Sequence, residues 1–319
     1  MRPRVFFYEG GDLIQPDPLL GTTGRANMTQ TTGIGKYRVT TTHNALGLRG
    51  PEVRQDRPKL RIMLIGDSFT YGVGVSDSGT ISQQMQELLT AQGIDAEVIN
   101  LGLGGYSTAQ VYYRLRSFIA LKPDLIIYTF CDNDPNDNVE FVNGNYHPYK
   151  PETYRSWWRV ILRRYSLTFM TALLKRPFIS KYTSDYPTHL VTANQQLVTP
   201  EFPERETELT RDFVDRIVIL AEEYKATFMI GFINVGLTEN NTVILSPIAK
   251  HYAAMFQEMG IELIPPPQTL AKYSNNLSVL RGEVPYAGHF NATGYRLWAE
   301  AYTAAALKWW THKKDETPE

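Results

Sequence analysis

Apolar runs of five to eight residues alternate with longer helical patterns through most of this chain. Strands are predicted for five such runs, at 60–66, 96–100, 124–131, 226–233 and 260–265. Helices are predicted between and after them, near 79–93, 107–121, 205–224, 245–258 and 291–310. Strands that alternate with helices form βαβ units with right-handed crossovers. The predicted fold class is therefore α/β, with a parallel sheet covered by helices on both faces.

Three segments fall outside this alternation. Residues 1–58 are rich in Gly, Pro, Thr and Asn, so we expect an extended arm with short strands, packed on a main domain of residues 59–312. Residues 140–203 are too long for a simple crossover and are expected to form an inserted helical cap. Residues 313–319 form a charged tail.

The predicted cap mixes basic residues with tryptophans and other apolar residues between 154 and 176. The ordinary interpretation is a helix packed on the domain with its arginines in water. The alternatives are a lid over a substrate, or a surface for a partner protein or for lipid. Membrane contact by residues 154–176 therefore stays open as a hypothesis.

Composition limits the partners and cofactors of the chain. Hydrophobic residues make up 43% and charged residues 20%, as in soluble globular proteins, and the net charge of −1 gives no reason to expect a nucleic acid partner. The single cysteine, Cys131, precludes an intramolecular disulfide, and no Cys/His cluster has the spacing of a zinc site. We expect neither a metal nor a cofactor, and the oligomeric state stays open.

The amino terminus, Met1-Arg2-Pro3-Arg4-Val5, lacks the apolar core of a signal peptide, and no run of 18 apolar residues suggests a membrane span. The chain as written is expected to be soluble. Its compartment is not decided by the sequence: it is cytoplasmic or, if a leader was removed, periplasmic or secreted.

A candidate nucleophile follows the first predicted strand. The apolar run 62–65 leads into Gly66-Asp67-Ser68, where the glycine permits a tight turn that leaves the serine hydroxyl at the carboxyl end of the strand. Ligands bind at that end in open α/β sheets. The same triplet is also common turn chemistry, so it does not establish a catalytic serine by itself.

Three later segments offer the groups that an activated serine needs, a base for its proton and donors for an oxyanion. The glycine-rich run 100–107 follows the second strand and offers the N–H of Gly105. Asn133 follows the third strand and offers its side-chain amide, and His289, before the last helix, is a candidate base. Turn formation and a structural histidine are the alternatives for each segment alone. All would meet at one edge of the sheet.

The ordered blocks Gly66-Asp67-Ser68, Asn100 through Gly105, Asn133-Asp134 and His289 resemble those of the SGNH hydrolases, also called GDSL esterases. The resemblance covers roughly residues 40–308, and the lead-in His43 through Gly50 is similar to one in bacterial members. It implies a flavodoxin-like three-layer α/β/α sandwich with a five-stranded sheet in the order 2-1-3-4-5.

The resemblance also implies roles for individual residues. Ser68 would be the nucleophile and His289 the general base. The oxyanion hole would consist of the N–H groups of Ser68 and Gly105 and the side chain of Asn133. Supporting roles would fall to Asp67 and Asp134.

One position departs from the family pattern. Members that end in Asp-Gly-His-Phe-Asn place the triad acid two residues before the histidine, where this chain has Ala287, and the residue before that is Tyr286. The acid holds the imidazole in one tautomer and stabilises the imidazolium. Three explanations stay open: a substitution that traps substrate or silences the enzyme, a Ser68–His289 dyad oriented by a backbone carbonyl, or a natural pseudo-enzyme.

Other site patterns do not fit. The Gly-x-Ser-x-Gly motif of α/β-hydrolases is absent because Thr70 stands at the last glycine, and Ser107 replaces the third glycine of a dinucleotide fingerprint. The polar run 132–138 lacks the central glycine of a calcium loop, and Asn143 holds the place of its bidentate glutamate. We interpret residues 132–138 as a polar active-site loop.

The sequence and the resemblance together predict a carboxylic ester hydrolase. It would remove a short, acetyl-like acyl group from a carbohydrate or small alcohol through an acyl-enzyme on Ser68, with activity impaired by Ala287. The alternatives are a non-catalytic acyl- or glycan-binding pseudo-esterase and an O-acyltransferase on the same fold.

Overall fold

The computed structural model describes residues 13–32, 38–144, 190–192, 202–238, 240–274, 276–282 and 288–316. The cap predicted at 140–203 lies outside the described residues except at its two ends and at one three-residue strand. Ala287 also lies outside them, as do residues 317–319 of the predicted tail.

The centre of the molecule is a parallel sheet of five strands, which confirms the predicted α/β class. In chain order the strands are β5 (Leu60–Gly66), β6 (Ala96–Asn100), β7 (Leu125–Phe130), β9 (Thr227–Phe232) and β12 (Glu262–Ile264). They lie side by side as β12-β9-β7-β5-β6, all pairs parallel. Numbered along the chain, this is the order 2-1-3-4-5 that the resemblance implied. Every residue of β5, β6 and β7 is buried, as in strands covered on both faces.

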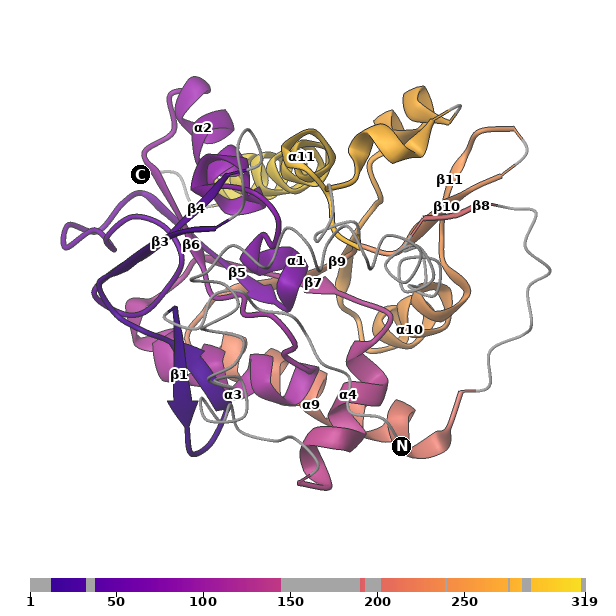
Figure 1. The fold of residues 1–319 in the computed structure, drawn as a ribbon, viewed down its shortest axis with the longest axis horizontal. Helices are drawn as coiled ribbons and strands as arrows, with labels where there is room; N and C mark the ends of the chain where they lie inside the picture. The colour runs from indigo at the N-terminus through magenta and orange to yellow at the C-terminus, as the bar shows by residue number, and fades with distance from the viewer. Residues whose placement is uncertain are drawn as a thin grey trace, which may run out of the picture.

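Helices cover both faces of the sheet. They are α2 (Ile81–Ala91) and α11 (Ala292–Glu316) on one face, and α3 (Thr108–Phe118), α9 (Glu204–Glu223) and α10 (Pro247–Glu258) on the other (Figure 1). Alternate residues of β5 enter the two cores: Ile62 and Leu64 lie in the cluster of α2 and α11, whereas Met63 and Ile65 lie in the other. This period of two produces the three layers. Within the described ranges, no helix is both long and apolar enough to cross a bilayer.

The interpretation of residues 132–138 as a loop is wrong, because helix α4 (Asp134–Val142) begins inside this run. Asn133 is the residue before the first turn, and Pro135 lies within it. Proline is favoured there because it needs no N–H partner, and the carboxylates of Asp134 and Asp137 lie near the positive end of the helix dipole. The polar residues therefore start a helix.

Several short elements were not expected from the sequence. Strands β10 (Val235–Leu237) and β11 (Val243–Leu245) form an antiparallel pair, and β8 (Leu190–Thr192) lies parallel to β10. Short 3₁₀ helices complete the connections: η1 (Asp77–Gly79), η2 (Ile119–Leu121), η3 (Gln268–Tyr273) and η4 (Leu277–Leu280).

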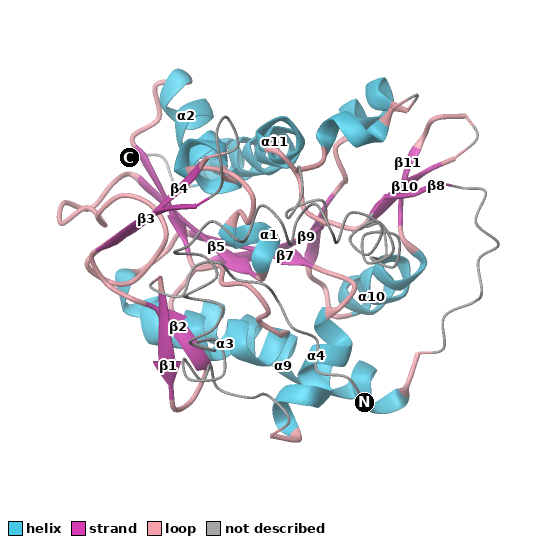
Figure 2. Cartoon of the chain, in the orientation of Figure 1, coloured by secondary structure: helices cyan, strands magenta, loops and turns pink. Residues whose placement is uncertain are grey.

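Two hairpins precede the sheet. They are β1 (Ile14–Asp17) with β2 (Gly21–Gly24), and β3 (Met28–Thr32) with β4 (Val39–His43). Figure 2 shows the first hairpin beside α3. The Tyr106 hydroxyl donates to the Thr22 carbonyl at 2.6 Å, and the Gln110 amide donates to the Leu20 carbonyl at 2.8 Å. These buried hydrogen bonds tie the first hairpin to α3 and to the loop that precedes it.

Candidate active site

Ser68 lies at the sharp turn between β5 and the single-turn helix α1 (Ser68–Tyr71). Gly66 enters this turn with φ +151°, and a Cβ there would lie 2.3 Å from Thr70 Oγ1 and 2.9 Å from the Thr129 carbonyl oxygen. Only glycine fits this position. The Asp67 carboxylate accepts the Phe69 N–H at 2.9 Å and caps α1. The turn therefore holds the Ser68 hydroxyl at the carboxyl end of a central strand.

His289 follows Ser68 by 221 residues in the chain, yet its side chain lies next to this hydroxyl. Its Nε2 lies 2.8 Å from Ser68 Oγ, within the range for proton transfer, and its ring packs on Phe69 with centroids 4.8 Å apart. The backbone next to it is anchored, since Gly282 N–H donates to the His289 carbonyl at 2.8 Å and Asn291 N–H donates to the Leu280 carbonyl at 2.9 Å. The structure thus brings the two predicted reacting groups into hydrogen-bonding contact.

The glycine-rich loop after β6 packs directly against α1. A Cβ at Gly102 would lie 2.4 Å from the backbone nitrogen of Tyr71, so a glycine is required at this close approach. Leu103 N–H donates to the Gly66 carbonyl, and the Asn100 side chain donates to the Thr70 carbonyl. Gly105 lies at the end of this loop with φ +79°, and no described residue accepts a hydrogen bond from its N–H.

Asn133 lies at the end of β7, at the same edge of the sheet as Ser68. Its amide nitrogen donates to the Asp137 carboxylate at 2.6 Å. A primary amide carries two N–H groups, so one remains for an oxyanion while Asp137 fixes its direction. The sequence analysis did not single out Asp137; its spacing of four residues after Asn133, at the start of a helix, was the available signal.

Asp67, in the turn before Ser68, and Asp134, at the start of α4, are both buried carboxyl groups. Asp134 accepts hydrogen bonds from the Tyr128 hydroxyl at 2.7 Å and from Cys131 N–H at 2.8 Å, while the Cys131 thiol interacts with Asp67. Burial raises the pKa of Asp67 to about 6, and burial followed by the Asp67 charge raises the pKa of Asp134 well above its usual range. Two such carboxyls disfavour simultaneous ionisation.

Asp132 is a further, partly buried carboxyl that the sequence analysis did not identify. Burial raises its pKa to about 7, and it accepts a hydrogen bond from the Ser246 hydroxyl at 2.9 Å. Ser246 caps α10, and the Asn234 side chain accepts the Asp132 N–H at 2.9 Å. This network ties the segment before Asn133 to the neighbouring strand and helix.

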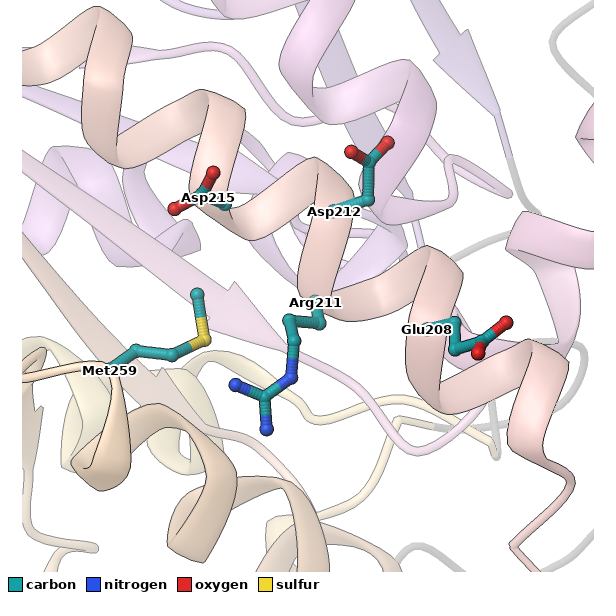
Figure 3. Close-up of a pocket in the computed structure, with 5 residues that line it drawn as sticks. All are labelled: Glu208, Arg211, Asp212, Asp215 and Met259. Carbon is teal, nitrogen blue, oxygen red and sulfur yellow. The ribbon is translucent and has the colours of Figure 1, made fainter.

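A surface hollow of about 430 Å³ lies elsewhere (Figure 3). It is lined by Glu208, Arg211, Asp212, Asp215 and Met259, on α9 and at the end of α10. Its charged residues on α9 are exposed, and none of the predicted site residues lines it. In the part of the chain that the structure describes, no group of three His, Cys, Asp or Glu residues is placed to hold a metal ion.

Several solved structures are similar to this chain at low sequence identity. A putative lipolytic protein of the G-D-S-L family from Desulfitobacterium hafniense is 16% identical, with a TM-score of 0.43 over 77% of this chain and 99% of that chain. The psychrotrophic esterase EstA from Pseudoalteromonas sp. is 10% identical, with a TM-score of 0.46 over 79% and 98%. A two-domain esterase active on acetylated mannans is 14% identical, with a TM-score of 0.45 over 78% and 49%.

No curated protein matches the sequence significantly. Residues 64–297, which include Ser68, the glycine-rich loop, Asn133 and His289, match the GDSL-like lipase/acylhydrolase family. Because this match covers most of the chain and spans the central sheet, the protein belongs to the GDSL-like lipase/acylhydrolase family.

Proposed function

We propose that this protein is a carboxylic ester hydrolase that forms an acyl-enzyme on Ser68. The observation that carries the proposal is the 2.8 Å contact between Ser68 Oγ and His289 Nε2, at the carboxyl edge of the sheet in a family of acylhydrolases. A serine hydroxyl is a weak nucleophile until an adjacent base accepts its proton. The contact supplies that base.

Each proton has a place to go in this arrangement. Ser68 Oγ attacks the ester carbonyl carbon while His289 Nε2 takes the hydroxyl proton. The resulting oxyanion accepts hydrogen bonds from the N–H groups of Ser68 and Gly105 and from the Asn133 amide. Collapse breaks the ester bond, and the alcohol leaves with the proton from His289. Water, deprotonated by His289, then attacks the acyl-enzyme, and the proton returns to Ser68 as the carboxylic acid leaves.

The proposed substrate carries a short, acetyl-like acyl group on a carbohydrate or small alcohol. Turnover is proposed to be impaired because Ala287 stands at the position of the family's triad acid. That same residue favours a second candidate, a pseudo-esterase that binds an acyl or glycan ligand without turnover. An O-acyltransferase would use the same acyl-enzyme with an alcohol in place of water.

Labelling with a fluorophosphonate tests the nucleophile separately from turnover. Ser68 Oγ attacks phosphorus, the P–F bond breaks and fluoride leaves, so the peptide that contains Ser68 gains the mass of the phosphonyl group. We expect labelling of the parent and none in Ser68→Ala. Ser117→Ala, which changes an exposed serine on α3, is the control and should label like the parent. Labelling elsewhere, or equal labelling of Ser68→Ala, would contradict the proposal.

The Asn133 amide is expected to contribute one oxyanion donor. In a chain whose activity has been restored by Ala287→Asp, Asn133→Ala should lower the rate of p-nitrophenyl acetate hydrolysis by roughly 10²–10³, the usual loss for one such donor. Asn136→Ala is the control, because Asn136 lies on the same helix, is exposed and also contacts Asp137. A change below about threefold in Asn133→Ala would remove Asn133 from this role.

A further inference from the structure

Arg49 is a buried cation whose hydrogen bonds converge on the segment that leaves the nucleophile helix. Its side chain is 1% exposed, and its Nε donates to Asp77 at 2.9 Å. One terminal nitrogen donates to the carbonyls of Tyr71 and Gly72 at 3.0 and 2.6 Å, and the other donates to the Val75 carbonyl at 2.5 Å. Its guanidinium also lies 4.9 Å from the centroid of the Tyr71 ring. The Arg49 side chain therefore holds the backbone of residues 71–75, which we call the exit of α1.

Helix α1 depends on such outside contacts. It is a single turn, and a helix this short is not stable by its own hydrogen bonds. Its last carbonyls, those of Thr70, Tyr71 and Gly72, accept hydrogen bonds from the side chains of Asn100 and Arg49. A cation is also favourable at the carboxyl end of a helix. Since Ser68 is the first residue of this turn, its orientation follows from what holds the other end.

Arg49 is itself held from both sides by the strands around it. Its backbone forms isolated bridges with His43 and with Asn100, the last residue of β6. His43 Nε2 lies 2.9 Å from the Tyr71 hydroxyl, and burial lowers the pKa of His43 to about 4, so this ring is neutral at pH 7. His43 therefore adds no positive charge beside Arg49.

We propose that Arg49 is a positioning residue for catalysis: it sets the placement of the Ser68 hydroxyl and N–H by clamping the carboxyl end of α1, without touching substrate. The proposal rests on the assignment of Ser68 as nucleophile. A displacement of the reacting atoms by about 1 Å can cost roughly 10²-fold in rate, so the placement of α1 matters for chemistry more than for binding. Lysine cannot replace Arg49, because an ammonium lacks the planar fork that reaches three carbonyls and a carboxylate together.

The chain offers a matched control in Arg61. Its side chain is 7% exposed, and it pairs with Glu97 at 2.7 Å and donates to the carbonyls of Leu121 and Arg54. It lies at the beginning of β5, whereas Ser68 follows the end of the same strand. Arg49→Lys and Arg61→Lys therefore disturb similar buried networks at opposite edges of the sheet.

The test measures the fluorophosphonate labelling rate of Ser68 and the kcat and KM for p-nitrophenyl acetate, together with the thermal midpoint of each variant. Both substitutions should lower the midpoint. Only Arg49→Lys should lower the labelling rate and kcat, by about 10- to 100-fold, with KM within about threefold of the parent. Arg61→Lys should keep both within about twofold. Parent-like labelling in Arg49→Lys, or an equal loss in Arg61→Lys, would overturn the proposal.

If Arg49→Lys is unfolded at the assay temperature, Asp77→Asn takes its place, because it removes the charged partner that orients the guanidinium and so should loosen its three carbonyl contacts. A loss of about threefold or more in labelling rate with unchanged KM supports the clamp, and an unchanged rate overturns it. A parent that does not label at Ser68 overturns the proposed function first, and the clamp with it. A parent that labels normally beside a normal Arg49→Lys overturns the clamp alone.

Discussion

Ala287→Asp is expected to raise kcat for p-nitrophenyl acetate by about 10²–10⁴-fold over the parent chain. In a serine triad, disabling the acid costs on the order of 10⁴ in kcat, because the imidazole loses its tautomer and the imidazolium loses its stabilising charge. Ala287 stands two residues before His289, the spacing of the acid in the family pattern. A carboxylate introduced there should restore both contributions while the Ser68–His289 contact stays as it is.

Ala287→Asn is the matched control, since asparagine has nearly the size of aspartate without its charge. It should leave kcat far below that of Ala287→Asp. A folded Ala287→Asp chain as inert as the parent would exclude the impaired-esterase interpretation. A parent that is already fast and depends on Ser68 would instead indicate a dyad that needs no acid.

His289→Ala, made in the chain that carries Ala287→Asp, is expected to lower kcat by roughly 10⁴–10⁶. Without the imidazole, the Asp67 carboxylate is the other described group near Ser68 that could accept a proton. One of its oxygens lies 3.4 Å from Ser68 Oγ. This separation is longer than the roughly 2.6–3.2 Å at which a base takes a proton, and the other oxygen of Asp67 already caps α1, so Asp67 is a poor substitute base. Nearly all of the restored turnover should therefore disappear.

The reference for this loss is His251→Ala. His251 lies on α10, stacked on Phe202 with centroids 3.9 Å apart, and has no part in the proposed chemistry. Its removal should leave kcat within about threefold. Adding Ser68→Ala to His289→Ala should cost little more, since groups that act as a unit are strongly non-additive. A further large loss in the double variant would show that Ser68 and His289 act independently.

The main sheet could be predicted because apolar residues dominate the central strands, although the buried pair of Arg61 and Glu97 interrupts the runs of β5 and β6. All residues of β5 are buried, so its run of apolar residues in the sequence corresponds directly to a strand that is covered on both faces. The order of the strands came from the resemblance, because periodicity does not say which strands are neighbours. Helix α4 was missed because its first turn is polar, and β10 and β11 were missed because strands of three residues are too short for a periodic pattern.

The candidate site also contains residues that the sequence predicts and residues that it does not. Ser68 and His289 could be named from short motifs whose residue types carry the chemistry, and the structure brings their side chains to 2.8 Å. Arg49 could not be named, because its importance lies in contacts across the fold rather than in its own reactivity, and Asp137 was missed together with the start of α4. The sequence analysis noted the His43–Gly50 lead-in as a similarity but offered no physical reason for it. The contacts of Arg49 with the exit of α1 provide one.

The family match covers residues 64–297, but residues outside this range also contact the segment around Ser68. The match begins at residue 64, inside β5, whereas Arg49 and both hairpins come earlier in the chain. Trimming the protein to its homologous part would cut through the central strand, and trimming at residue 59 would strip the outer margin of β6, leaving unpaired backbone groups that invite aggregation. The segment before residue 60 therefore contributes contacts around Ser68 that lie outside the family match.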